Sequence, residues 1–134
     1  MLPKDKLTRL EFVQLLERLA EGWNNGNAQQ ASECFTSDAL YIEPPDKQYY
    51  AGRAALYKFF GGPNGRAGQM NMIWHHILFD EESQIGAGEF TFTYGDTVHG
   101  VTMLKVRDGL ISNWREYWYA SPLTWEEFTE RNNF

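Results

Sequence analysis

In the second half of the chain, apolar and polar residues alternate along four consecutive segments: 70–79, 85–94, 97–107 and 110–119. A period of two is typical of strands that bury one face. Short turn signals separate the segments, and the strongest is Asp108-Gly109, which is typical of a two-residue hairpin loop. The pattern therefore predicts an antiparallel meander of four strands.

The first half of the chain predicts helices. Residues 8–23 carry apolar side chains on one stripe at helical spacing, and Thr8 with Glu11 fits a capping box. Four shorter elements are predicted by similar signals: helices over 28–35 and 53–60, a strand over 39–43, and a last helix within 124–134 that Thr124 and Glu127 cap. Helices followed by a meander predict an α+β fold, with the helices on one face of a curved sheet.

Composition limits the class of protein. The 134 residues predict one domain, 1–134, and a content of 43% hydrophobic and 16% aromatic residues predicts a well-filled core or an aromatic-lined cavity. A net charge of −6 without a basic run argues against nucleic acid or an anionic membrane as partner. The single cysteine, Cys34, and a first segment without an apolar core predict a soluble, cytoplasmic protein.

The turns also predict which side chains face each other. A loop at Asp108-Gly109 places Glu116 opposite Val101, and a loop at Gly95-Asp96 places His99 opposite Phe92. Alternation then puts these residues on one apolar face: Phe90, Phe92, Tyr94, His99, Val101, Met103, Trp114, Glu116 and Trp118. We expect this face to lie under the helices, with Glu116 and His99 as diagonal neighbours about 7–8 Å apart at the backbone.

Glu116 is the most informative residue of the chain, because it stands between two tryptophans in the stretch NWREYW. A buried carboxyl has its pKa raised by desolvation, and a nearby imidazolium lowers it again. A carboxyl tuned in this way works as a general acid or base near neutral pH. The alternative is a structural carboxyl that bonds to helix N–H groups or to His99.

Several stretches together resemble a known superfamily. The order WNNGN, CFTSDALYIEPP, YYAGRAALYKFF and DGLISNWREYW is similar to that of nuclear-transport-factor-2-like proteins, more narrowly the SnoaL-like and ketosteroid-isomerase-like small proteins. The resemblance covers nearly all of residues 8–120. It implies a cone-shaped half-barrel, in which a curved, mainly antiparallel sheet wraps around the N-terminal helices and encloses a pocket. It also implies a homodimer, for which we expect the convex face of the sheet.

The resemblance carries over to individual residues only in part. Glu43 before Pro44 matches the place of the catalytic base in ketosteroid isomerases, but Leu19 and Met103 stand where those enzymes have their oxyanion-hole donors. Glu116 matches the last-strand Asp of limonene epoxide hydrolases. The Arg-x-Asp pair of those hydrolases has no counterpart in 86–93.

These arguments define the candidate site. The catalytic candidates are Glu116, His99 and Glu43, and the ligand-binding candidates are Trp23, Tyr49, Trp74, Phe92 and Trp118. Core packing is the alternative for the aromatic residues. We predict no cofactor and no metal, since His75-His76 has no ligand spacing and only one of the two is expected to face His99. The run from Gly61 to Gly65 lacks the lysine of a phosphate loop, and we interpret it as a mobile loop near the pocket mouth.

The leading hypothesis is an enzyme that uses acid–base catalysis on a small hydrophobic organic molecule, without a cofactor. Isomerisation, dehydration, cyclisation and hydrolysis remain open as reaction types. The second hypothesis is a non-catalytic ligand-binding module with the same pocket. The third is a filled core, with the exposed sheet face of Leu104, Tyr117 and Tyr119 serving dimerisation alone.

Overall fold

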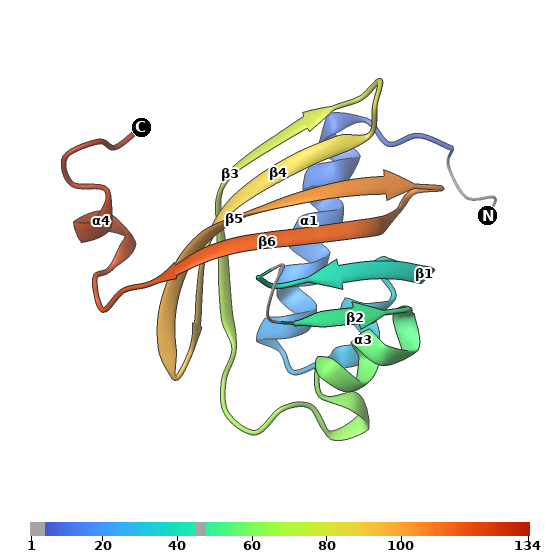
Figure 1. Cartoon of the computed structure of the whole chain (residues 1–134), viewed down its shortest axis with the longest axis horizontal. Helices are drawn as coiled ribbons and strands as arrows, with labels where there is room; N and C mark the ends of the chain where they lie inside the picture. Colours follow the sequence, from blue (N-terminus) through green and yellow to red (C-terminus); the bar gives the residue numbers. More distant parts are fainter. Residues whose placement is uncertain (1–4, 45–47) are drawn as a thin grey trace.

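A computed structural model describes residues 5–44 and 48–134 of the chain (Figure 1). The helices are α1 (Arg9–Asn24), α2 (Ala28–Ser32), α3 (Arg53–Phe59), the 3₁₀ turn η1 (Gly62–Asn64) and α4 (Trp125–Phe128). The strands are β1 (Phe35–Ile42), β2 (Tyr49–Ala51), β3 (Asn71–Asp80), β4 (Ile85–Tyr94), β5 (Asp96–Arg107) and β6 (Leu110–Ala120). They form one mixed, unclosed, curved sheet in the order β2-β1-β6-β5-β4-β3, in which only β1 and β6 pair in parallel. The predicted α+β fold is confirmed.

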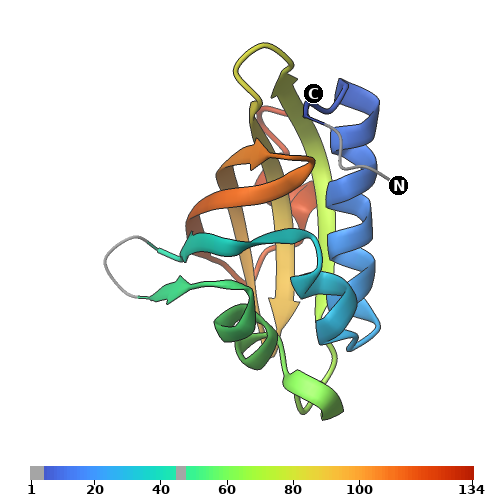
Figure 2. The same cartoon turned by 90° about the vertical axis from the view of Figure 1, so that its right-hand side faces the viewer.

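Helix α1 runs along one face of the sheet and packs against β3 (Figure 2). Thr8 caps its first turn as predicted: the Thr8 hydroxyl accepts from the Glu11 N–H, and the Glu11 carboxylate accepts from the Thr8 N–H. Its apolar stripe is fully or almost fully buried, and it includes Phe12, Leu16, Leu19 and Trp23. Helix α1 therefore begins where the capping box indicates, and it buries the face on which the sequence places the apolar side chains.

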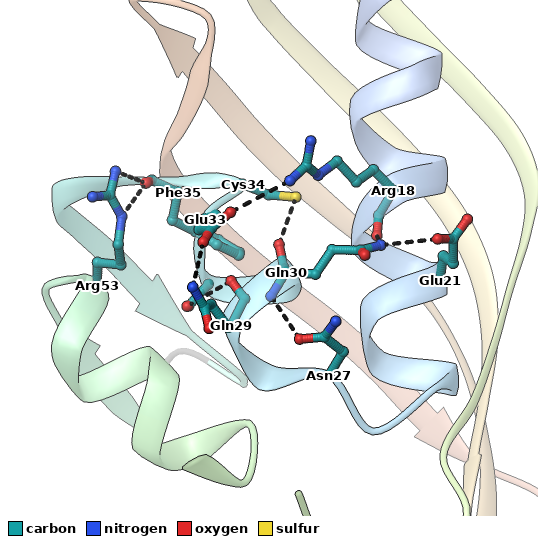
Figure 3. A network of polar contacts seen from close by, with 10 residues as sticks. Arg18, Glu21, Asn27, Gln29, Gln30, Glu33, Cys34, Phe35 and Arg53 are labelled. Atoms are coloured by element: carbon teal, nitrogen blue, oxygen red, sulfur yellow. Dashed lines mark hydrogen bonds and ion pairs between the residues drawn. The ribbon is translucent and has the colours of Figure 1, made fainter. Parts of the chain in front are cut away.

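Helix α2 is shorter than predicted, because it ends at Ser32 and Phe35 already begins β1. Polar contacts fix this junction (Figure 3). The Gln30 amide donates to the Arg18 carbonyl, and the Arg18 guanidinium pairs with Glu33, so that α2 is tied to α1. The Arg53 guanidinium donates twice to the Phe35 carbonyl, at 2.6 and 2.9 Å, and so links α3 to the start of β1.

The register of the meander differs from the prediction in two places. Tyr94 pairs with Asp96, so the turn holds Gly95 alone and not two residues. At the other hairpin Arg107 pairs with Leu110 as predicted, but a bulge between Lys105 and Val106 then shifts the pairing by one residue. A shift of one residue turns a strand over relative to its neighbour.

The consequence is that β5 faces the opposite way from the prediction. Its inward residues include Gly100, Thr102 and Leu104, and Leu104 is 2% exposed. Leu104 therefore belongs to the core and not to the outer face, where we had placed it. His99, Val101 and Met103, predicted to face inward, lie on the outer face.

The core between helices and sheet is built largely from aromatic rings around Trp114. The Trp114 ring stacks on Tyr41 with 5.4 Å between centroids and packs edge-on against Trp23. Phe35 and Phe60 complete the cluster, and all five residues are buried. Rings of this size bury a large apolar area each, so this cluster stabilises the fold strongly and anchors β1 beside β6.

None of the helices in the described part of the chain is both long and apolar enough to cross a membrane.

Candidate active site

A cavity of about 320 Å³ lies between the helices and the inner face of the sheet. Trp23 of α1, Tyr41 of β1 and Phe60 after α3 form part of its wall, and Phe92 and Trp118 contribute from the sheet. Two carboxyl groups, Glu43 and Glu116, reach into the same cavity. The described residues thus enclose a hollow, and half of the residues that line it are aromatic.

Glu116 lies inside, as predicted, and is 8% exposed. Residues two apart on a strand share a face, so Trp114 and Trp118 flank it on β6. The indole N–H of Trp114 donates to Glu116 Oε1 at 2.9 Å. Burial raises the pKa of Glu116 well above its ordinary value, and the charge of Glu43 raises it further.

Glu43 directly follows β1, the strand that runs parallel to β6. Tyr41 pairs with Trp114 and Ile42 with Arg115, so the next position along brings Glu43 beside Glu116. The Tyr41 hydroxyl donates to Glu43 Oε2 at 2.8 Å, and the two carboxyl groups hydrogen-bond to each other. Burial raises the pKa of Glu43, while the bonds from Tyr41 and Glu116 and the charge of Arg66 oppose that rise.

The two carboxyls differ in their surroundings, and this difference assigns their protonation. Two carboxyl groups that interact disfavour each other's ionised form, so the pair holds a proton more tightly than a lone carboxyl does. Glu43 receives two hydrogen bonds and feels a positive charge, which favours its ionised form. Glu116 is the more deeply buried of the two, and its pKa is raised more strongly, which favours its acid form. The arrangement supplies a base and an acid at one point of the cavity.

His99 does not lie beside Glu116, which corrects the predicted pair. It is buried, but on the outer face of the sheet, under the segment that follows β6. Its Nδ1 bonds to the Thr91 hydroxyl at 2.8 Å and its Nε2 to the Leu123 carbonyl at 2.9 Å, while the Phe128 ring packs against it at 4.4 Å. The buried partner of Glu116 is Glu43, which we had proposed separately.

Neither of the adjacent histidines of β3 reaches the cavity. A bulge between Trp74 and His76 leaves His75 unpaired, and both imidazoles lie on the outer face. His75 bonds to the Thr91 hydroxyl and stacks on Trp125 at 3.8 Å. Because the bulge adds a residue, the expectation that the pair points to opposite faces is wrong. Within 5–44 and 48–134, no three His, Cys, Asp or Glu side chains gather as metal ligands would.

The aromatic candidates divide into two groups. Trp23, Phe92 and Trp118 line the cavity, and their binding role stays a prediction. Tyr49 is 62% exposed and borders a separate hollow beside Met103 and Arg115, so it is not part of this wall. Trp74 packs against Phe90 and Trp114 and donates to the Leu16 carbonyl at 2.9 Å, which makes it a core residue that is absent from the cavity wall.

Two residues of the site were missed in the sequence. Tyr41 stands two positions before Glu43 on the same strand face, and that spacing was a usable signal. Arg66 lines the cavity from the loop after η1, and no local pattern marks it. The fold and the site thus define a class: an α+β pocket protein with a carboxyl pair enclosed by aromatic rings.

The family follows from comparison with known proteins. The profile of the SnoaL-like domain matches residues 16–114, and the chain belongs to this family. No curated protein sequence matches the chain.

Solved structures show the same fold at low sequence identity. A protein of cystatin-like fold from Methylobium petroleophilum has a TM-score of 0.71 and 17% identity, and the match covers 90% of this chain and 82% of that one. A putative ketosteroid isomerase from Kribbella flavida gives 0.68 and 22%, over 90% and 87%. An epoxide hydrolase from M. tuberculosis described as LEH-like gives 0.66 and 18%, over 83% and 84%.

Proposed function

We propose that the protein is an enzyme that uses acid–base catalysis on a small, largely apolar organic molecule without a cofactor. The observation that carries this proposal is the contact between Glu43 and Glu116 inside an aromatic cavity. A structural role alone gives no reason to bury two acidic groups against each other, since such a contact costs free energy. The same fold in a putative ketosteroid isomerase and in an epoxide hydrolase is consistent with such chemistry.

The chemistry follows from the hydrogen bonds of the pair. Glu43, as carboxylate, accepts a proton from an acidic carbon of the substrate or from an attacking water. Glu116, as acid, gives its proton to a carbonyl, hydroxyl or epoxide oxygen of the substrate. The bond that the two carboxyls share lets a proton return from Glu43 to Glu116, which resets the site for the next turnover.

Apolar walls support the choice of substrate class. The rings of Trp23, Phe92 and Trp118 line the cavity and offer apolar area to a hydrophobic body. Isomerisation, dehydration, cyclisation and hydrolysis each use one acid and one base, and all four stay within the proposal.

The test compares matched variants on a panel of carbonyl compounds with an acidic α-carbon, β-hydroxy carbonyl compounds and epoxides. Once a substrate is found, Glu43→Gln and Glu116→Gln are each expected to lower kcat by about 10²-fold or more, because each removes one proton-transfer group. Glu126→Gln on α4, exposed and outside the cavity, is the control. If both cavity variants keep full turnover, the mechanism is wrong. Binding of ligands without turnover of any compound would favour the non-catalytic module.

We also propose a homodimer through the outer sheet face. Support comes from large apolar side chains exposed there, with Tyr117 48% and Tyr119 66% exposed. Light scattering on the purified protein is expected to give twice the mass of one chain. A Tyr117→Lys variant should give the mass of a single chain, and a monomeric wild type would refute the assembly.

A further inference from the structure

The glycine-rich segment after α3 is built into a tight turn that presents Arg66. Gly61 has φ of +123°, and a Cβ there would lie 2.4 Å from the Arg66 backbone nitrogen. Gly65 has φ of +68°, and a Cβ there would lie 2.9 Å from the Gly26 carbonyl oxygen, in the turn after α1. Only glycine fits both places. The segment that we interpreted as a mobile loop is therefore packed closely, and it holds the next residue in a set position.

The side chain of Arg66 is also held in place. Its Nε donates to the Phe59 carbonyl at 2.9 Å, and its guanidinium lies 4.5 Å from the centre of the Phe59 ring and 5.4 Å from that of Tyr94. The Tyr94 hydroxyl donates to the carbonyl of Ala67, which ties the two segments together. A guanidinium fixed between two rings loses little conformational freedom when it binds a ligand.

The terminal donors of Arg66 have no protein acceptor within the residues that the structure describes. The hydrogen bond to Phe59 uses Nε, and no described carboxylate lies within 4.0 Å of the guanidinium. Both Nη groups are therefore available to a ligand in the cavity that Arg66 lines. Gln48 lines the same cavity, and since its Oε1 accepts from the Tyr50 hydroxyl, its amide N–H groups are the ones left to donate.

The guanidinium and the deeper carboxyl differ in burial. Glu116 and the rings of Tyr41 and Phe60 are buried, whereas Tyr94, which Arg66 contacts, is 37% exposed. The charge of Arg66 acts on Glu43, and the Gln48 carbonyl accepts from the Glu43 N–H at 3.1 Å, so both donors belong to the Glu43 side of the pair. A ligand in the cavity therefore meets one guanidinium, apolar rings and the carboxyl pair.

We propose that the ligand of this cavity is an amphipathic anion, with its oxyanion head bound by Arg66 and its apolar body between the rings. The inference rests on the proposed function and names its substrate class. A planar guanidinium donates two parallel bonds to a carboxylate, and it binds sulfonate and phosphate oxygens in a similar way. The head fixes the orientation of the molecule relative to Glu43 and Glu116.

The test uses two fluorescent probes that differ only in the charged head. 8-Anilinonaphthalene-1-sulfonate carries a sulfonate, and N-phenyl-1-naphthylamine is the same body without it. Wild type is expected to bind the sulfonate more tightly than the amine, and added salt should weaken the sulfonate alone. Displacement of the sulfonate by 1-naphthaleneacetate, but not by its methyl ester, is expected for a site that also accepts a carboxylate.

Variants assign the effect to the cavity. Arg66→Gln is expected to weaken sulfonate binding about tenfold or more, because it removes charge-assisted hydrogen bonds, and to leave amine binding within about twofold. Arg115→Gln is the matched control, since it removes the same charge from the exposed side of β6. Arg66→Lys keeps the charge and should retain part of the sulfonate affinity. If Arg66→Gln does not fold, the salt dependence of sulfonate binding in the wild type and the sulfonate affinity of Arg66→Lys still test the role of Arg66.

Three outcomes would overturn the proposal: equal wild-type affinity for the two probes, equal loss of both in Arg66→Gln, or no loss of either. The readout is binding, so it is separate from the proposed chemistry. Glu43→Gln and Glu116→Gln should keep at least wild-type affinity for the sulfonate even where turnover is lost. Failure of the Arg66 assignment would leave the role of the carboxyl pair untouched.

Discussion

Replacing Glu116 with glutamine should change how the stability of the fold depends on pH. Burial and the charge of Glu43 raise the pKa of Glu116 well above its ordinary value of 4.5. The folded chain therefore keeps a proton on this carboxyl at pH values where the unfolded chain has released it. Because the folded state then binds more protons, the free energy of unfolding falls as pH rises from the unfolded pKa to the folded pKa.

The size of the effect follows from this linkage. One proton gives a slope of up to about 1.4 kcal/mol per pH unit, so the wild type loses up to about 3 kcal/mol between pH 5 and pH 7. For a chain of 134 residues this corresponds to a fall of roughly 10 °C in Tm. Glutamine keeps an oxygen to accept from the Trp114 indole and cannot ionise, so Glu116→Gln should lose the part of this slope that Glu116 contributes, while burial of Glu43 keeps a part of its own.

The measurement is urea unfolding followed by tryptophan fluorescence at pH 5, 6, 7 and 8, for wild type and Glu116→Gln side by side. Burial lowers the pKa of His75, which has the opposite sign: its contribution to stability grows as pH rises toward 6.5. That contribution is common to both proteins and cancels in the difference between them. Parallel profiles, or a wild type that gains stability relative to the variant as pH rises, would refute the buried acid.

Three further predictions concern other parts of the fold. Gly100→Ala places a Cβ 2.4 Å from the Tyr117 carbonyl oxygen, so it should destabilise the sheet by about 1–3 kcal/mol; a thermal scan with unchanged Tm would contradict the close approach. Burial raises the pKa of the Cys34 thiol to about 12, so a thiol reagent at pH 8 should label the chain only after unfolding in guanidinium, and fast labelling of the native protein would argue against it. Thr91→Val removes the hydroxyl that bonds to both His75 and His99 and should cost about 1–3 kcal/mol in urea unfolding, where an unchanged midpoint would show that the bridge is not needed.

Local signals in the sequence predicted the elements well. The capping boxes at Thr8 and Thr124 form as expected, and the bounds of the meander strands agree within one residue at every end. The errors in extent are at the last helix, where α4 already ends at Phe128, and at α2, where Phe35 joins β1 and not the helix. There the tertiary contact decides, because Arg53 binds the Phe35 carbonyl from a helix that lies far along the chain.

The register shows why one catalytic candidate was placed correctly and another was not. The loop at Gly95 has one residue and not two, so the register of β5 against β4 is shifted by one residue. The side chains of β5 therefore exchange faces, and His99 lies on the outer face. The bulge between Lys105 and Val106 then turns β6 over relative to β5. The two errors cancel for β6, so Glu116 points inward as predicted although neither hairpin has the assumed register over its full length. A bulge without glycine leaves little trace in a single sequence, and such an error is not visible from the turns alone.

The carboxyl pair depends on contacts that no local pattern encodes. Glu43 and Glu116 meet because β1 lies parallel to β6, with Tyr41 beside Trp114. A hairpin loop fixes the pairing of two strands that follow each other in the chain. No hairpin loop joins β1 to β6. Their pairing follows instead from the packing of aromatic rings between these strands and α1. The sequence indicated each glutamate by its own surroundings, one before a proline and one between tryptophans. Only the three-dimensional structure joins two separate candidates into one carboxyl pair, and the same folding brings Arg66 to the cavity from a loop that no strand pattern describes.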